Sequence, residues 1–145
     1  MSTKTKHKHH ARRGFTLIEI IVVVMIITIL ATLIAPRLLG RVATAKQAAA
    51  QSGAKTIATQ VKLYTLDMGL NSPPNDFDLE LLLLTAEKGG GPSGPYFERS
   101  DELVDPWDNP FQIEIPGDVN YSFDIISWGE DGEPGGEGVN EDITQ

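Results

Sequence analysis

Carboxylates and glycines gather in residues 127–143, near the end of the chain, where they could bind a hard cation. The acidic side chains of this stretch are those of Glu130, Asp131, Glu133, Glu137, Glu141 and Asp142. Ca²⁺ takes about six to eight oxygen ligands from carboxylates, carbonyls and water, and the spacing here does not match an EF-hand loop. A solvated acidic tail that keeps the protein soluble is the alternative interpretation. The residue types alone leave both interpretations open.

Glu19 is the single charged residue in the apolar run of residues 15–35. A carboxylate at the centre of a membrane helix costs about 2.5–3.5 kcal/mol on insertion scales. Near the end of the helix the side chain reaches the interface, and the cost falls. We therefore expect Glu19 to have a specific partner or to extend towards water.

The sequence contains no residue pattern that favours catalysis. His7, His9 and His10 could bind a metal, but they stand in a short basic segment for which we predict no site. After that segment the chain contains no His and no Cys, which excludes most catalytic triads and thiol chemistry. Asp76 and Asp78 could form a glycosidase pair, but no apolar cleft pattern surrounds them. Walker and Rossmann glycine loops are also missing from the sequence, so we predict that the protein is not an enzyme.

The net charge of −8 hides a strong asymmetry along the chain. Five Lys and Arg residues precede Phe15, whereas from Leu63 onward 2 basic residues face 19 acidic ones. Nucleic acid requires a basic surface, so nucleic-acid binding is excluded for this part. Cysteine is absent, so no disulfide stabilises the domain, and a bound ion is one substitute.

The apolar run of residues 15–35 is long enough to cross a membrane, because about 20 apolar residues span a bilayer as a helix. The basic residues before it should stay in the cytoplasm and direct the rest of the chain outward. A secretory signal would have a shorter apolar region followed by a small-residue cleavage site. We therefore predict a retained membrane helix.

Helical periodicity continues beyond the apolar run. Pro36 should kink the helix without ending it. An apolar stripe then follows three- and four-residue steps, which predicts a helix face packed on a core. Gly69 supplies a stop signal. The stripe consists of Ala50, Ala54, Ile57, Val61, Tyr64 and Met68.

Shorter elements follow this long helix. Asp76 is expected to cap a helix over residues 77–87. Alternating apolar and polar residues at 111–115 and 121–125 predict an antiparallel strand pair. The sequence thus predicts a single α+β domain in which a long N-terminal helix packs on a small antiparallel sheet.

The segment Arg12-Arg13-Gly14-Phe15-Thr16-Leu17-Ile18-Glu19 resembles the processing site of type IV prepilins and type II secretion pseudopilins. The resemblance implies that prepilin peptidase cuts between Gly14 and Phe15 and methylates the Phe15 amine. Residues 1–14 would then be a cleaved cytoplasmic leader. Residues 15–35 would be a transmembrane and polymerisation helix, and residues 36–145 a periplasmic head that includes the rest of the helix.

The same resemblance implies a role for Glu19. In a polymer, this carboxylate would meet the Phe15 amine of a neighbouring copy. Pairing with the Phe15 amine of its own chain, or simple extension to the interface, are the alternatives.

Residues 105–111, Asp-Pro-Trp-Asp-Asn-Pro-Phe, resemble the Asp-Pro-Trp-Gly-Asn-Pro-Tyr signature of major pseudopilins. Asp108 stands where glycine is common, which predicts a small local difference in the backbone. The acidic end resembles the calcium loop of that family, where Trp128 replaces a leucine and Glu141 a commoner aspartate or alanine. The implied ligands are side-chain oxygens of Asp131, Glu141 and Asp142 and backbone oxygens of Trp128 and Val139.

The resemblance implies a type IV pilin-like fold and a mechanical function. The chain would be a single-pass inner-membrane protein that forms a homopolymer, the periplasmic pseudopilus, which drives folded proteins across the outer membrane. Minor pseudopilins and an inner-membrane assembly platform would be further partners. A type IV pilus subunit and a monomeric membrane-tethered calcium-binding module are the alternatives, although the usual pilin cysteine pair is absent.

Overall fold

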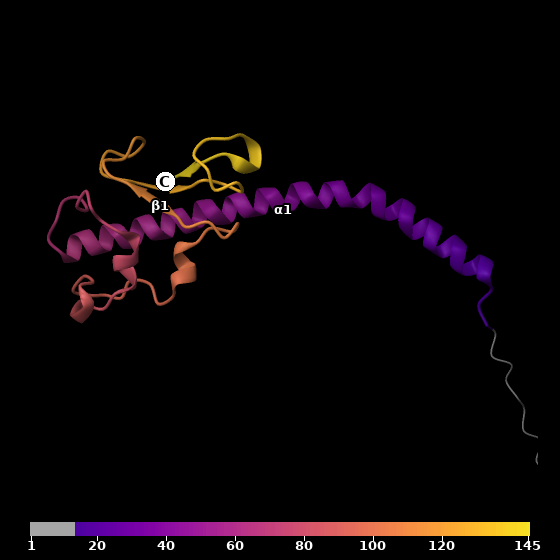
Figure 1. Cartoon of the computed structure of the whole chain (residues 1–145), viewed down its shortest axis with the longest axis horizontal. Coiled ribbons are helices and arrows are strands. Elements are labelled where there is room, and N and C mark those ends of the chain that lie inside the picture. The colour runs from indigo at the N-terminus through magenta and orange to yellow at the C-terminus, as the bar shows by residue number, and fades with distance from the viewer. Residues whose placement is uncertain (1–13) are drawn as a thin grey trace, which may run out of the picture. The chain divides into compact units, whose positions relative to one another are not determined.

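The computed structural model describes residues 14–145 (Figure 1). The chain divides into two compact units between Leu39 and Gly40. The basic residues before Gly14 and the three histidines of the sequence prediction lie outside the described residues.

The first unit contains the first part of helix α1, which runs from Leu17 to Asp67. Its segment Leu17–Ile34 is long and apolar enough to cross a membrane, and none of its residues is buried among the residues that the structure describes. Phe15, predicted as the first residue of the span, precedes the helix. The helix continues through Pro36, so the prediction that this proline does not end it is confirmed.

In the second unit, α1 packs one face on the core as the periodicity predicted. Four of the predicted stripe residues are fully buried and Tyr64 is nearly so, whereas Met68 is 46% exposed. Including Met68 was wrong because the chain reverses direction just there. The Gly69 N–H donates to the Leu66 carbonyl at 3.0 Å, and the Leu70 N–H donates to the Thr65 carbonyl at 2.9 Å. This is a Schellman motif, and it confirms the predicted stop at Gly69. The four fully buried residues are Ala50, Ala54, Ile57 and Val61.

A three-stranded antiparallel sheet of order β1-β2-β3 lies along this part of α1 (Figure 1). The strands are β1 (Gln112–Glu114), β2 (Asp124–Ser127) and β3 (Ile143–Thr144). The predicted antiparallel pair is confirmed, with Ile113 opposite Ile125. Strand β2 starts three residues later than predicted, and β3 was not predicted.

The predicted helix over residues 77–87 is wrong. Two short 3₁₀ helices replace it, η1 (Leu79–Leu83) and η2 (Ala86–Lys88). In a continuous α-helix the Leu82 carbonyl would accept from Ala86. Here it accepts from the N–H groups of Tyr96 at 2.8 Å and Phe97 at 3.1 Å instead. The cap of η1 is Asp78, not Asp76, and its carboxylate accepts from Glu80 N–H at 2.9 Å.

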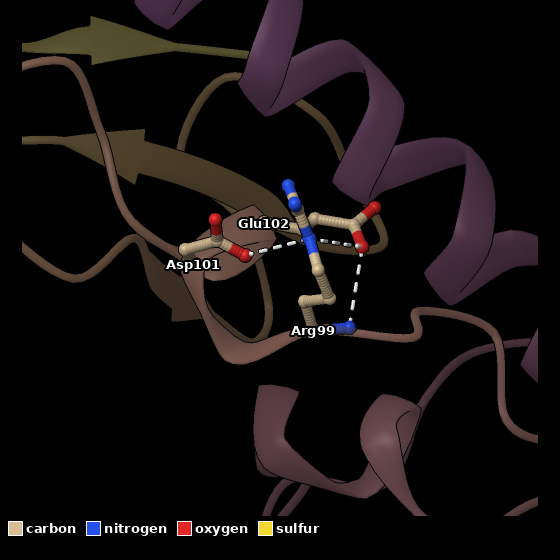
Figure 2. A network of polar contacts seen from close by, with 3 residues as sticks. All are labelled: Arg99, Asp101 and Glu102. Carbon is tan, nitrogen blue, oxygen red and sulfur yellow. Dashed lines mark hydrogen bonds and ion pairs between the residues drawn. The ribbon is translucent and has the colours of Figure 1, made fainter.

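Two further 3₁₀ helices complete the second unit, η3 (Ser100–Leu103) and η4 (Gly138–Asn140). At the start of η3 the Arg99 N–H donates to Glu102 at 3.2 Å, and the Arg99 guanidinium pairs with Asp101 at 3.1 Å (Figure 2). These side chains are mostly exposed, so the ion pair adds little stability.

The core lies between α1, the 3₁₀ segments and the sheet. Ile57, Val61, Leu82 and Ile125 are fully buried there, which confirms the predicted α+β class. At the end of α1 the Tyr96 hydroxyl donates to Asp67 at 2.7 Å. Burial and this carboxylate raise the pKa of Tyr96 to about 12, so the phenol keeps its proton at neutral pH.

Candidate functional site

Glu19 caps the start of α1. One of its carboxylate oxygens accepts from both the N–H and the hydroxyl of Thr16, each at 2.8 Å. In return the Thr16 hydroxyl accepts from Glu19 N–H at 3.3 Å. This reciprocal pair is a capping box, which was not predicted although its Thr-x-x-Glu spacing is readable in the sequence. Within this chain, then, Glu19 has a local partner.

The predicted cleavage site lies in an accessible segment. Gly14 and Phe15 precede α1 and adopt no regular secondary structure. The Phe15 side chain is 84% exposed. The bond between these residues therefore lies outside the helix.

The loop of residues 105–111, called here the Asp-Pro-Trp loop, is organised by a buried carboxylate. Asp105 is 4% exposed, and one of its oxygens accepts from the N–H groups of Trp107 and Asn109, both at 2.9 Å. The other oxygen accepts from the Ser127 hydroxyl at 2.6 Å. This network ties the loop to the end of strand β2.

Asp108 in this loop has φ 70°, the left-handed conformation. Because glycine is common at this place in the signature, a positive φ is what a glycine there would readily adopt. The predicted small difference from the family's backbone at this position stays a prediction. Aspartate tolerates this conformation better than most residues.

The acidic loop, defined as residues 128–142, connects β2 to β3. It folds back on itself, since the Glu130 N–H donates to the Val139 carbonyl at 3.1 Å. Asp131 accepts from Glu133 N–H at 3.2 Å, and one oxygen of Asp142 accepts from Gly135 N–H at 2.9 Å. These bonds give the predicted ligand segment a defined path.

The C-terminal end of the loop borders a cleft of about 440 Å³ between α1 and β3. Glu141 and Asp142 line one wall of this cleft, and Gln47 of α1 lines the other. The Gln47 side-chain amide also donates to the Gly138 carbonyl. Helix α1 therefore holds this part of the loop directly.

The predicted ligands satisfy part of what a calcium ion requires. Among residues 14–145, outside the side chains of 35–39, no three His, Cys, Asp or Glu side chains converge closely enough to hold a metal. One oxygen of Asp142, however, is buried and has no hydrogen-bond partner among the residues that the structure describes. A buried carboxylate oxygen without a partner is costly, and a cation would satisfy it. Carboxylate and carbonyl oxygens are the ligand atoms that Ca²⁺ prefers, so the predicted ligands are of the right chemical type for this ion.

Comparisons with known proteins agree over nearly the whole chain. The sequence model described as "Type II secretion system (T2SS), protein G" matches residues 37–145, and the one described as "Prokaryotic N-terminal methylation motif" matches residues 9–35. The chain is 38% identical over 133 residues to type II secretion system core protein G of Xanthomonas campestris pv. campestris, covering 90% of this chain and 87% of that protein. It is 39% identical over 134 residues to the protein of the same description in Pseudomonas aeruginosa, covering 90% and 92%.

A solved structure shares this fold. It is the major pseudopilin from the type 2 secretion system of enterohaemorrhagic Escherichia coli, at a TM-score of 0.57 and 25% identity. The match covers 76% of this chain and 94% of that one.

Proposed function

This chain belongs to the type II secretion system protein G family, and we propose that it is a major pseudopilin, the structural subunit of a periplasmic pseudopilus. Subunits leave the inner membrane, pack their apolar helices together and help drive folded proteins across the outer membrane. Minor pseudopilins and an inner-membrane assembly platform take part in this assembly. The type IV pilus alternative is not favoured, because residues 37–145 match protein G of the secretion system.

The observation that carries this proposal is the exposed apolar segment Leu17–Ile34, which residues 14–145 leave uncovered. Its large side chains are about half exposed or more. Lipid covers such a surface in the membrane, and other copies of the helix cover it in a filament. A monomeric tether would require only the lipid.

Crosslinking distinguishes the polymer from the monomeric tether. Cysteines at both Val22 and Ile29 add the only thiols to a chain that has none. We expect this double variant to form ladders of multimers after oxidation when the host expresses the secretion machinery, whereas a variant with one cysteine joins two chains at most. Bands no larger than the dimer from the double variant would contradict the polymer.

Processing is proposed to occur between Gly14 and Phe15, with methylation of the new Phe15 amine by prepilin peptidase. The chemistry of Glu19 supports this proposal, since cleavage would remove Arg12 and Arg13 and leave the new Phe15 amine as the cation at the start of the apolar span that holds Glu19. Mass spectrometry of the membrane-extracted protein should find a first residue of methylated phenylalanine. A retained Met1 would contradict the proposal.

A bound calcium ion is proposed to stabilise the acidic loop. Side chains of Asp131, Glu141 and Asp142 and the carbonyls of Trp128 and Val139 would hold it, and the buried unpartnered oxygen of Asp142 supports the proposal. The ion would link the end of β2 to β3 and so replace the disulfide that this chain lacks. Enzymatic chemistry is not part of the proposed function.

Thermal unfolding of the detergent-solubilised full chain tests the ion. Calcium at a hundred times its dissociation constant should stabilise the head by about 2.7 kcal/mol, and chelator should reverse this. Asp131→Ala should remove most of the response. Asp118→Ala, an exposed aspartate outside the loop, is the matched control and should respond as the natural chain does. An equal response from Asp131→Ala and the natural chain would contradict the assignment.

A further inference from the structure

We infer that Asn109 is a positioning residue for the acidic loop, holding residues 129–132 in the geometry that an ion requires. This inference rests on the proposed calcium site and goes beyond it. Asn109 belongs to the Asp-Pro-Trp loop and is not among the proposed ligands.

Asn109 contacts the beginning of the acidic loop through its side-chain amide. Its Nδ2 donates to the Gly129 carbonyl at 2.9 Å, and the side chain is half-buried. Gly129 directly follows Trp128, whose carbonyl is a proposed ligand. The bond therefore fixes the peptide plane next to that carbonyl.

The same amide lies against Gly132. A Cβ added there would lie 2.8 Å from Asn109 Oδ1 and 3.2 Å from its Nδ2. The loop thus passes so close to Asn109 that a side chain at residue 132 would have to displace the Asn109 amide. Asp131, the first proposed carboxylate ligand, stands between the two glycines that Asn109 touches.

Asn109 is itself held rigidly. Its N–H donates to the buried Asp105 carboxylate at 2.9 Å, and Ser127 donates to the same carboxylate from the end of β2. The Ser127 hydroxyl in turn accepts from Gly129 N–H at 3.4 Å. The N–H and the carbonyl of Gly129 are therefore both bonded within one network that includes Asp105 and Asn109.

Such support matters because a loop ordered before the ion arrives loses less conformational freedom on binding. Groups that orient metal ligands without touching the metal typically change affinity by about 10- to 100-fold when removed. We therefore expect Asn109→Ala to weaken calcium binding by about 10-fold.

The decisive variant is Asn109→Asp, measured by isothermal titration of calcium into the full chain in detergent micelles. It removes the donor to the Gly129 carbonyl but adds a negative charge near the loop. If charge alone governed affinity, calcium would bind more tightly. The positioning role predicts weaker binding, because the new carboxylate repels the Gly129 carbonyl. Asn71→Asp, an exposed position outside both loops, adds the same charge and should leave the affinity unchanged.

Hydrogen exchange without calcium separates the two proposals. Amides of residues 129–132 should exchange faster in Asn109→Ala than in the natural chain, whereas amides of buried α1 should not change. Unchanged exchange together with an unchanged calcium affinity would overturn the positioning role and leave the calcium site standing. Absence of calcium binding by the natural chain would overturn the calcium site, and with it the role of Asn109 towards the ion.

Discussion

Helix α1 contains two stretches that are both α-helical but are stabilised by different contacts. Leu17–Ile34 buries no residue against the described part of the chain, although almost all its side chains are apolar. The later stretch, Ala50–Thr65, is amphipathic and buries one face against the 3₁₀ segments and the sheet. The first stretch therefore depends on lipid or on other copies, and the second on contacts within its own chain.

The two units also differ in how their carboxylates are bonded. Glu19 lies at the start of an exposed apolar helix and is accommodated by Thr16, through bonds that any capped helix could make. In the second unit, buried carboxylates such as Asp105 and Asp124 organise loops that lie far along the chain from α1. A polymer role for Glu19 must therefore be separated experimentally from its capping role.

The largest expected effect concerns Glu19. In Glu19→Gln the amide oxygen can still accept from Thr16, so the cap is kept, but the charge that would meet a neighbouring Phe15 amine is lost. Leaving a buried charge without its partner costs about 3–5 kcal/mol. We expect the crosslinked ladder of the cysteine variants to disappear while the amount of processed protein is unchanged.

Thr16→Val is the matched control, because it removes the hydroxyl that caps α1 and keeps the charge of Glu19. Its ladder should remain. If the two variants lose the ladder equally, Glu19 acts through the cap and the distinction between the two stretches of α1 is weaker than proposed.

A second prediction contrasts core and surface on the same helix. Ile57→Ala removes a fully buried side chain and should lower the free energy of unfolding by about 2–5 kcal/mol. Leu66→Ala, at a position that is 72% exposed, should change it by less than about 0.5 kcal/mol. Thermal unfolding of the solubilised full chain measures both. Equal effects would mean that the later stretch of α1 is not held by the core between the helix and the sheet.

The features that were predicted correctly depend on residues close together in the sequence. The stripe on α1, the stop at Gly69 and the antiparallel strand pair all follow from local periodicity and turn chemistry. The family resemblance drawn from residues 12–19 and 105–111 is confirmed as well. The capping box at Thr16 was equally local and could have been found.

Distant partners explain what could not be predicted. The helix expected over residues 77–87 is interrupted because the Leu82 carbonyl bonds to Tyr96 and Phe97. Strand β3 has only two residues, too few for a periodic signal. The bond from Asn109 to Gly129 spans 20 residues, so nothing in either segment alone indicates it. The calcium ligands remain a prediction for the same reason, since their convergence is a property of the folded loop.

A third prediction uses pH to examine the loop between β1 and β2. Asp124 is fully buried, and burial alone would disfavour its charge. Hydrogen bonds from Val119 N–H and from the backbone and side chain of Asn120, at 2.7–2.8 Å, outweigh this and lower the pKa of Asp124 below its ordinary value. Its stabilisation is therefore present above the unfolded pKa of about 3.9 and is lost as the pH falls through the folded value.

Asp124→Asn should cost about 1–3 kcal/mol at pH 7, because the amide nitrogen faces an N–H donor that then lacks an acceptor. The gap to the natural chain should narrow as the pH falls below the ordinary range of aspartate pKa values and the natural carboxyl takes up its proton. Asp118→Asn, at an exposed position of the same loop, is the control and should follow the natural pH profile. A gap that stays constant from pH 7 to pH 2 would show that charge on Asp124 is not what stabilises the loop.

The smallest effect is expected at Asp108 in the head, where a residue with a side chain has a left-handed backbone conformation. The regular helix of Leu17–Ile34 has no such strained residue. A left-handed residue with a Cβ costs about 1–2 kcal/mol, less for aspartate than for most, and glycine avoids this cost. Because glycine also gains freedom in the unfolded chain, the net gain of Asp108→Gly should be about 0.5–1 kcal/mol, seen as a rise of a few degrees in the melting temperature. Asp108→Ala should instead lower the melting temperature, since alanine keeps the Cβ without the tolerance of aspartate. If Asp108→Gly did not raise the melting temperature and Asp108→Ala did not lower it, the backbone of the Asp-Pro-Trp loop would be free to relax at residue 108. Asn109 would then be held in place only by the hydrogen bonds of Asp105 and Ser127.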